Sequence, residues 1–128
     1  MNTKLLMTSS ALILGLAGVF ALFAPDVLLS GAAVTGNLSV MIQLMGALYF
    51  SFALMNWTAK DSLIGGIYAR PVSLANFSHF FAGALLLLKQ QLSNEMNLSI
   101  LAALIVYAVY AACFYWLVFR STGIKVDK

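Results

Sequence analysis

The sequence predicts an all-α, polytopic membrane protein: a bundle of four transmembrane helices in one domain, residues 1–128, with both chain ends in the cytosol. Three observations predict it. Of the 128 residues, 62% are hydrophobic and 9% are charged, whereas roughly 25% are charged in soluble domains. The apolar residues form four long runs, and the charged residues lie near the ends of these runs. So few charges could not cover a water-exposed surface, and lipid must therefore contact much of the exterior.

Each of the four runs supplies the roughly 20 predominantly apolar residues that a membrane-spanning helix needs. We expect helices over residues 4–24, 38–59, 71–88 and 96–119. Pro25 ends the first helix and Pro71 opens the third, because proline suits the first turn of a helix. Polar residues ahead of the other two helices are the candidate N-caps: Asn37 or Ser39 for the second, and Ser93 or Asn94 for the fourth.

The first apolar run also resembles a secretory signal peptide, because Lys4 precedes it. However, the run is longer than the usual signal core of roughly 7–15 residues, and no clear small-x-small cleavage site follows it. We therefore expect the chain to keep this helix as its first span.

The basic residues predict the orientation of the helices. With a cytosolic N-terminus, Lys89 lies outside and six basic residues lie inside: Lys4, Lys60, Arg70, Arg120, Lys125 and Lys128. This bias follows the positive-inside rule and argues against insertion in two opposite orientations. Trp57 and Trp116 both fall near the cytosolic interface, where indole rings prefer to lie. Basic residues placed at helix ends face lipid headgroups, which argues against a nucleic-acid partner.

Polar side chains within the expected spans lie mostly in the cytosolic half, between roughly 5 and 15 Å from the inner helix ends. We expect five of them to point inward and meet in one cytosol-facing pocket: Tyr49, Asn56, Asn76, His79 and Tyr110. Asn76 and His79 share a helix face because they are three residues apart. The cluster has two interpretations: a binding site for a small lipophilic molecule, or interhelical hydrogen bonds that hold the bundle together.

Small residues predict where helices approach one another closely. Ala11, Gly15 and Gly18 follow one another at three- and four-residue spacing in the first helix. The fourth helix carries a comparable set: Ala103, Ala108, Ala111 and Ala112. Such residues serve either packing within the chain or association with a second copy or another membrane protein.

The sequence offers little for catalysis, so we expect no catalytic residue, no metal site and no cofactor. No Asp or Glu lies within an expected span, although proton-coupled transporters generally keep one there. The single histidine, His79, cannot by itself supply two haem ligands or a zinc site. The single cysteine, Cys113, cannot form an internal disulfide or a CxxC motif, and a small buried apolar role suits it.

The whole chain resembles the small four-helix bacterial membrane proteins of the DoxX-like kind in its length, number of helices and short loops. The motifs that look like a local signature of this family are Asn56-Trp57, Gly65-Gly66-Ile67-Tyr68-x-Arg70-Pro71 and Asn76-Phe77-x-His79. The resemblance implies a location in the bacterial inner membrane, and it transfers no catalytic residue.

Two functions follow as hypotheses. The first is a non-enzymatic accessory or self-associating subunit, because catalytic groups are missing and small residues occur at packing intervals in two helices. The alternative is a binder or carrier of a small lipophilic molecule, such as a quinone or a lipid, in the polar pocket around His79. A channel would need a polar pore stripe, and none is visible in the sequence. The expected partners are the lipid bilayer, a second copy or a membrane partner protein, and, under the alternative, the lipophilic molecule.

Overall fold

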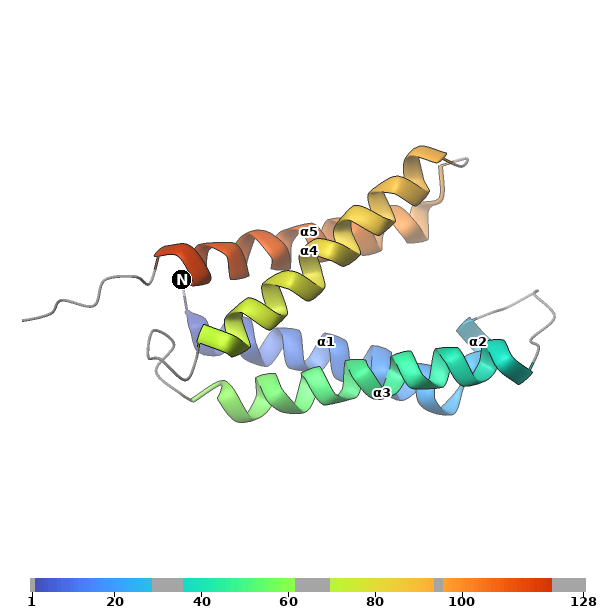
Figure 1. Cartoon of the computed structure of the whole chain (residues 1–128), viewed down its shortest axis with the longest axis horizontal. Coiled ribbons are helices and arrows are strands. Elements are labelled where there is room, and N and C mark those ends of the chain that lie inside the picture. The colour runs from blue at the N-terminus through green and yellow to red at the C-terminus, as the bar shows by residue number, and fades with distance from the viewer. Residues whose placement is uncertain (1, 29–35, 62–69, 94–95, 121–128) are drawn as a thin grey trace, which may run out of the picture. The chain divides into compact units, whose positions relative to one another are not determined.

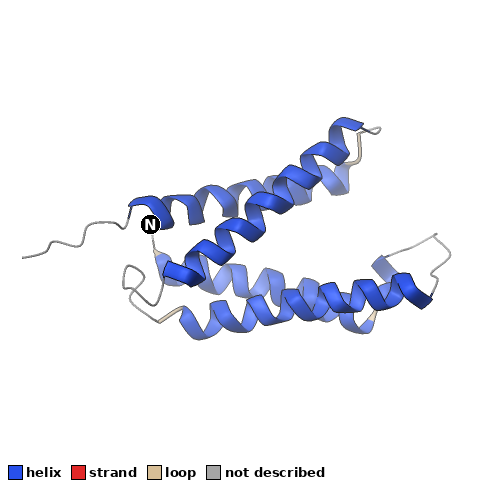
Figure 2. Ribbon diagram, in the orientation of Figure 1, coloured by secondary structure: helices blue, strands red, loops and turns tan. Residues whose placement is uncertain are grey.

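The computed structural model describes residues 2–28, 36–61, 70–93 and 96–120. Within these ranges the chain forms five α-helices and no β-strand (Figure 1, Figure 2). The helices are α1 (Thr3–Phe23), α2 (Pro25–Leu28), α3 (Gly36–Ala59), α4 (Arg70–Ser93) and α5 (Leu98–Arg120). Among them α1, α3, α4 and α5 are long and apolar enough to cross a membrane. This confirms the prediction of an all-α chain with four helices capable of spanning.

Helix contacts divide the chain into two compact units, Met1–Asp61 and Ser62–Lys128. In the first unit α1 packs along α3, and the single turn of α2 touches both. In the second unit α4 packs along α5. Figure 1 shows the two pairs, with α1 in blue beside α3 in green, and α4 in yellow beside α5 in orange and red. The prediction of one domain over residues 1–128 stays a prediction, because it concerns the two units together.

The helix α4 is longer than predicted, because it continues to Ser93 whereas the sequence prediction ended it at Leu88. That prediction placed the helix end where the apolar run ends. Lys89, Gln90 and Gln91 come next, and all three are good helix formers, so the helix continues beyond the apolar run. The connection between α4 and α5 is correspondingly shorter than predicted.

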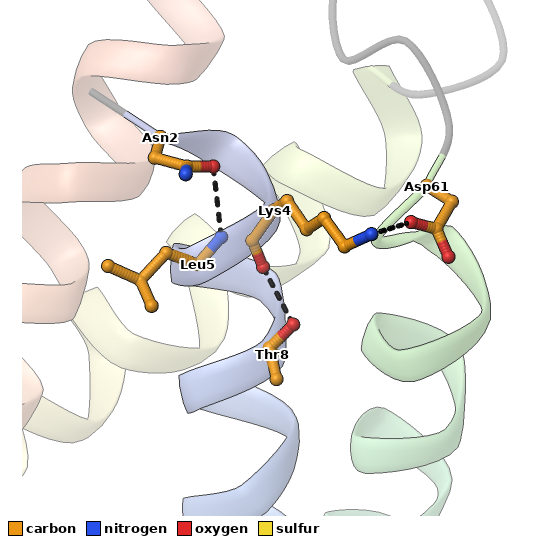
Figure 3. Close-up of polar contacts among 5 residues, drawn as sticks. All are labelled: Asn2, Lys4, Leu5, Thr8 and Asp61. Carbon is orange, nitrogen blue, oxygen red and sulfur yellow. Dashed lines mark hydrogen bonds and ion pairs between the residues drawn. The ribbon is translucent and has the colours of Figure 1, made fainter.

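The two long helices of the first unit start slightly earlier than predicted. Asn2 caps α1, because its side-chain oxygen accepts a hydrogen bond from the N–H of Leu5 at 3.3 Å (Figure 3). Asn37 and Ser39 lie inside α3, which begins at Gly36, so neither caps it as predicted. Polar residues can occupy the first turn of a helix, so each helix begins before its apolar run does. The first residue of the run therefore placed the predicted helix start too late.

The start of α5 also differs from its prediction. Ser93 is the last residue of α4 rather than a cap of α5, and Asn94 lies outside the described residues. Asn97 takes the capping role, because its side-chain oxygen accepts hydrogen bonds from the N–H groups of Ser99 and Ile100 at 2.9 and 3.4 Å. An asparagine in this position satisfies helix N–H groups that have no partner within the helix.

Gly18 of α1 and Gly46 of α3 bring the two helix backbones into contact. A Cβ atom on Gly18 would lie 2.8 Å from the carbonyl oxygen of Gly46, and a Cβ atom on Gly46 would lie 2.9 Å from the carbonyl oxygen of Gly18. No side chain fits into such gaps. Nearer the start of α1, Gly15 faces Ala53 at an ordinary contact distance of 3.4 Å. The glycines of α1 therefore serve packing within the chain, one of the two interpretations that the sequence left open.

Stacked aromatic rings join the two helices of the second unit. Phe80 of α4 is fully buried, and its ring centroid lies 4.8 Å from that of Tyr110 and 5.9 Å from that of Phe114, both on α5. Gly83, almost one turn further along α4, lies against the ring of Tyr107, where a Cβ atom would approach Cδ1 to 2.5 Å. Each favourable ring pair adds about 0.5–1.5 kcal/mol beyond the burial of its area.

Large apolar side chains are exposed along all four long helices, for example at Leu16, Leu44, Leu86 and Ile105. In α3, only 11% of the most apolar part of the helix is buried. An apolar surface of this extent is unfavourable in water, so it requires lipid or another protein as its neighbour.

Gly46→Ala is expected to lower the free energy of unfolding by about 1–3 kcal/mol, because the new Cβ atom would push α1 and α3 apart. Titration of the purified protein with sodium dodecyl sulfate in mixed micelles, followed by circular dichroism, measures this change. Gly15→Ala is the matched control, since its Cβ atom would meet only Ala53 at 3.4 Å. Equal stability of the two variants would contradict the backbone contact at Gly46.

Candidate functional site

The five residues predicted to form one polar pocket belong to different units. Tyr49 and Asn56 are on α3, in the first unit. Asn76 and His79 are on α4 and Tyr110 is on α5, in the second unit. Tyr49 is half-buried on α3. The meeting of all five side chains stays a prediction.

Asn56 is fully buried and is held by a side chain of the neighbouring helix α1. Its Nδ2 atom donates a hydrogen bond to Oγ of Ser10 at 3.0 Å. The Ser10 hydroxyl in turn donates to the carbonyl oxygen of Met7 at 3.0 Å. These bonds offset the cost of removing an amide and a hydroxyl from water.

The predicted pocket omits Ser10, although the sequence contains a signal for it. The start of α1 lies beside the end of α3, because Lys4 and Asp61 form an ion pair there. Ser10 and Asn56 are therefore near the same end of an antiparallel helix pair. Matching polar residues by their depth in neighbouring helices would have joined the two.

The ion pair between Lys4 and Asp61 closes this end of the first unit. Nζ of Lys4 lies 2.6 Å from Oδ1 of Asp61 (Figure 3). The hydrogen bond from the Lys4 ammonium lowers the pKa of Asp61 below its ordinary value of 3.8. The pair therefore stabilises the fold above the ordinary carboxyl pKa, and this contribution is lost as the pH falls through the lowered pKa. Both side chains are exposed, so the contribution is small.

A second cation at the end of α3 lies over an aromatic ring. Nζ of Lys60 is 3.1 Å from the centroid of the Trp57 ring, and Trp57 is exposed. Such a cation–π contact holds the ammonium group over the ring face. Lys4, Lys60 and Trp57 thus give this end of the unit the combination of basic and indole groups that is typical of a membrane interface.

Buried polar groups also occur in the first turns of α4. Asn76 is fully buried, and its Nδ2 atom donates to the carbonyl oxygen of Val72, one turn earlier, at 2.9 Å. Ser73 is buried three residues before Asn76 and shares its helix face. The predicted pocket omits Ser73. Its three-residue spacing from Asn76 in the sequence indicates that the two residues share a helix face.

The ring of His79 lies against two aromatic rings of its own unit. The centroid of the imidazole is 5.7 Å from that of Tyr107 and 5.2 Å from that of Phe80. The Tyr110 ring stacks on Phe80, with 4.8 Å between centroids, and the expected contact between Tyr110 and His79 stays a prediction. Tyr107, which contacts His79, precedes Tyr110 by three residues and shares its helix face.

The groups gathered on these helices are amides, hydroxyls, one imidazole and aromatic rings. In the described part of the chain, no three His, Cys, Asp or Glu side chains are placed where they could hold a metal ion. Amides, hydroxyls and imidazole donate and accept hydrogen bonds, and rings stack on planar molecules. These groups can therefore pack against one another or bind a planar molecule that forms hydrogen bonds.

Comparison of the chain with protein-family models, with curated proteins and with solved structures finds no match in any of the three. The resemblance to DoxX-like membrane proteins therefore stays a prediction. Its motif residues Asn56 and Trp57 lie on α3 and those from Arg70 to His79 lie on α4, whereas residues 65–69 lie outside the described residues.

A double-mutant cycle with Asn56→Ala and Ser10→Ala is expected to show a coupling energy of about 0.6 kcal/mol, the average for interhelical hydrogen bonds in a membrane protein, and at most about 1.7 kcal/mol. Unfolding by sodium dodecyl sulfate measures each variant. Thr58→Ala is the control, because its exposed hydroxyl donates only to carbonyl groups of α3 itself. Additive effects of the Asn56 and Ser10 changes would contradict the hydrogen bond between them.

Proposed function

We propose that the chain is an integral membrane protein of the bacterial inner membrane that crosses the bilayer four times and acts without catalysis, as an accessory or self-associating subunit. The four apolar helices support the spanning arrangement. Lipid is the neighbour that suits their exposed apolar side chains. The backbone also suits lipid, because a spanning helix forms all its backbone hydrogen bonds internally.

Both termini lie in the cytosol in this proposal. The distribution of basic residues supports this orientation, because Lys89 is the single one that it places outside. Trp57 and Lys60, in contact at the end of α3, suit the inner interface. If protease added outside intact cells cleaved a tag placed after Lys128, this result would contradict the orientation.

The observation that carries the subunit proposal is the outer surface of α3. Gly46 and Ala53 face α1, whereas Ala47 and Ser51 lie on the opposite side of the helix and are exposed. The Ser51 hydroxyl donates to the carbonyl oxygen of Ala47 at 2.8 Å, so it is satisfied without water. Small residues four apart on an exposed apolar helix favour close approach by another helix.

Cross-linking in native membranes tests the proposed association. A variant with Ser51→Cys in a Cys113→Ser background is expected to give a defined dimer or partner band with a bismaleimide reagent. Adding Ala47→Leu should lower the yield of cross-linked product about fivefold or more. The larger side chain blocks the close approach of the second helix, and that contact is worth on the order of 1 kcal/mol.

Leu12→Cys in the same background is the matched control for this experiment. Leu12 is exposed on α1 and lies nine residues from the start of its helix, while Ser51 lies eight residues from the end of α3. The reagent therefore meets both cysteines at similar depth. A strictly monomeric Ser51→Cys protein, or equal bands for Ser51→Cys and Leu12→Cys, would count against the subunit proposal.

The second candidate function, a binder or carrier of a quinone or another small lipophilic molecule, is favoured by the contacts of His79. Its imidazole lies against Tyr107 and Phe80, and Asn76 is buried one turn away on the same helix. A planar headgroup could stack on such rings and accept or donate hydrogen bonds.

Native mass spectrometry of gently purified protein tests the second candidate. A bound small molecule is expected, and His79→Ala and Asn76→Ala should each reduce its occupancy about fivefold, as the loss of one hydrogen bond of roughly 1 kcal/mol would do. Ser78→Ala is the control, because Ser78 lies between the two residues but is exposed. Unchanged occupancy in both variants would exclude a pocket around His79.

A further inference from the structure

Four aromatic side chains of the second unit form a continuous ring surface, called here the aromatic face: Phe77 and Phe81 of α4, and Tyr115 and Phe119 of α5. The Phe77 ring is at its centre, with its centroid 5.4 Å from that of Phe81, 5.8 Å from that of Tyr115 and 6.1 Å from that of Phe119. Tyr115 and Phe119 are themselves 4.6 Å apart. These contacts fix the four rings against one another across the helix pair.

The aromatic face looks outward from the helix pair. Phe81, Tyr115 and Phe119 are 47%, 53% and 55% exposed. It is a separate surface from the one that contains Asn76 and Phe80, because those side chains are fully buried. About half of each of these three rings is exposed, so the aromatic face can contact another molecule as well as join α4 to α5.

The end of the second unit next to the aromatic face is positively charged. Arg70 is the first residue of α4 and Arg120 is the last residue of α5, and the contacts of Phe77 with the end of α5 place both at the same end of this antiparallel pair. Arg70 is exposed and shares a helix face with Phe77, seven residues later. The ranges 70–93 and 96–120 contain no Asp or Glu. This end of the pair therefore complements an anion.

On the side away from the arginines, the same face of α5 carries smaller side chains. Ala112 and Ala108 precede Tyr115 at helical spacing and are both exposed. Along one surface, the order is thus arginine, aromatic rings and then alanines. A molecule that fits this order has an anionic head and an apolar tail that continues past the rings along the helix.

We propose that the aromatic face and Arg70 bind an anionic phospholipid from the leaflet at that end. The Arg70 guanidinium binds the headgroup phosphate, for which its planar donors are well suited, and the acyl chains lie on the rings and past Ala112 and Ala108. Basic positions beside transmembrane helices on the cytosolic side are known headgroup sites. The inference rests on the proposed insertion into a bilayer, and it does not depend on self-association.

Native mass spectrometry of the full chain, released from nanodiscs made of equal amounts of phosphatidylglycerol and phosphatidylcholine, tests the inference. The wild-type protein is expected to retain phosphatidylglycerol in clear preference to phosphatidylcholine. Arg70→Gln should lower this retention about fivefold, as expected for one basic residue near an anionic lipid surface. The double variant Tyr115→Leu with Phe119→Leu keeps the helix apolar and should lower it by a similar factor.

Two controls match these changes. Lys89→Gln removes an exposed basic residue from the other end of α4, and Phe23→Leu removes an exposed ring from α1. Both should retain phosphatidylglycerol as the wild type does. His79→Ala should also retain it, which separates this lipid from a ligand of the second candidate function. Circular dichroism confirms helicity, and if the double variant does not fold, Arg70→Gln carries the test.

Equal retention of the two phospholipids by the wild type, or unchanged retention in both Arg70→Gln and the double variant, would overturn the inference. So would a co-purified protein that occupies the aromatic face in place of lipid and is lost with these variants. Flotation of the protein with vesicles of the same lipids tests membrane insertion separately from the lipid site. A chain that does not float contradicts membrane insertion itself, whereas one that floats without preferring phosphatidylglycerol contradicts only the lipid site.

Discussion

Two helices that both face hydrocarbon gain little from burying apolar side chains against each other, so their pairing depends on close packing at small residues. Gly18 and Gly46 meet this requirement in the first unit, where the backbones themselves touch. In the second unit Gly83 leaves the space that the ring of Tyr107 fills. The glycine contact fixes how α1 lies along α3, and the hydrogen bond between Ser10 and Asn56 follows from that alignment.

Each helix therefore has two surfaces with different roles. In α3 one side carries the glycine contact and Asn56, while the opposite side, with Ala47 and Ser51, is exposed. In the second unit the buried side holds Asn76 and Phe80, and the exposed side carries the aromatic face. Asn56 and Asn76 are hydrogen-bonded on the buried sides and the exposed sides are largely apolar, which is the arrangement expected where lipid replaces water.

The sequence predicted the helical class and the four long helices well, because an apolar run long enough to span is a strong local signal. It misplaced the end of α4, where Lys89 and the two glutamines extend the helix by propensity rather than by hydropathy. For the candidate site, the sequence identified Asn56 and Asn76 as buried polar residues. It did not identify Ser10 as the partner of Asn56, because that pairing is seen only when the depths of polar residues in two different helices are compared.

The ion pair between Lys4 and Asp61 has a consequence for biosynthesis. In the proposed four-span arrangement, α1 takes its orientation before α3 has brought Asp61 back to the side where Lys4 lies. Lys4 then carries its full, unneutralised charge at the moment when the first helix chooses its orientation, which is when a basic residue has most influence. Only after α3 returns to the same side does Asp61 neutralise that charge. In that proposed arrangement, one lysine serves first as an orientation signal and afterwards as a structural contact.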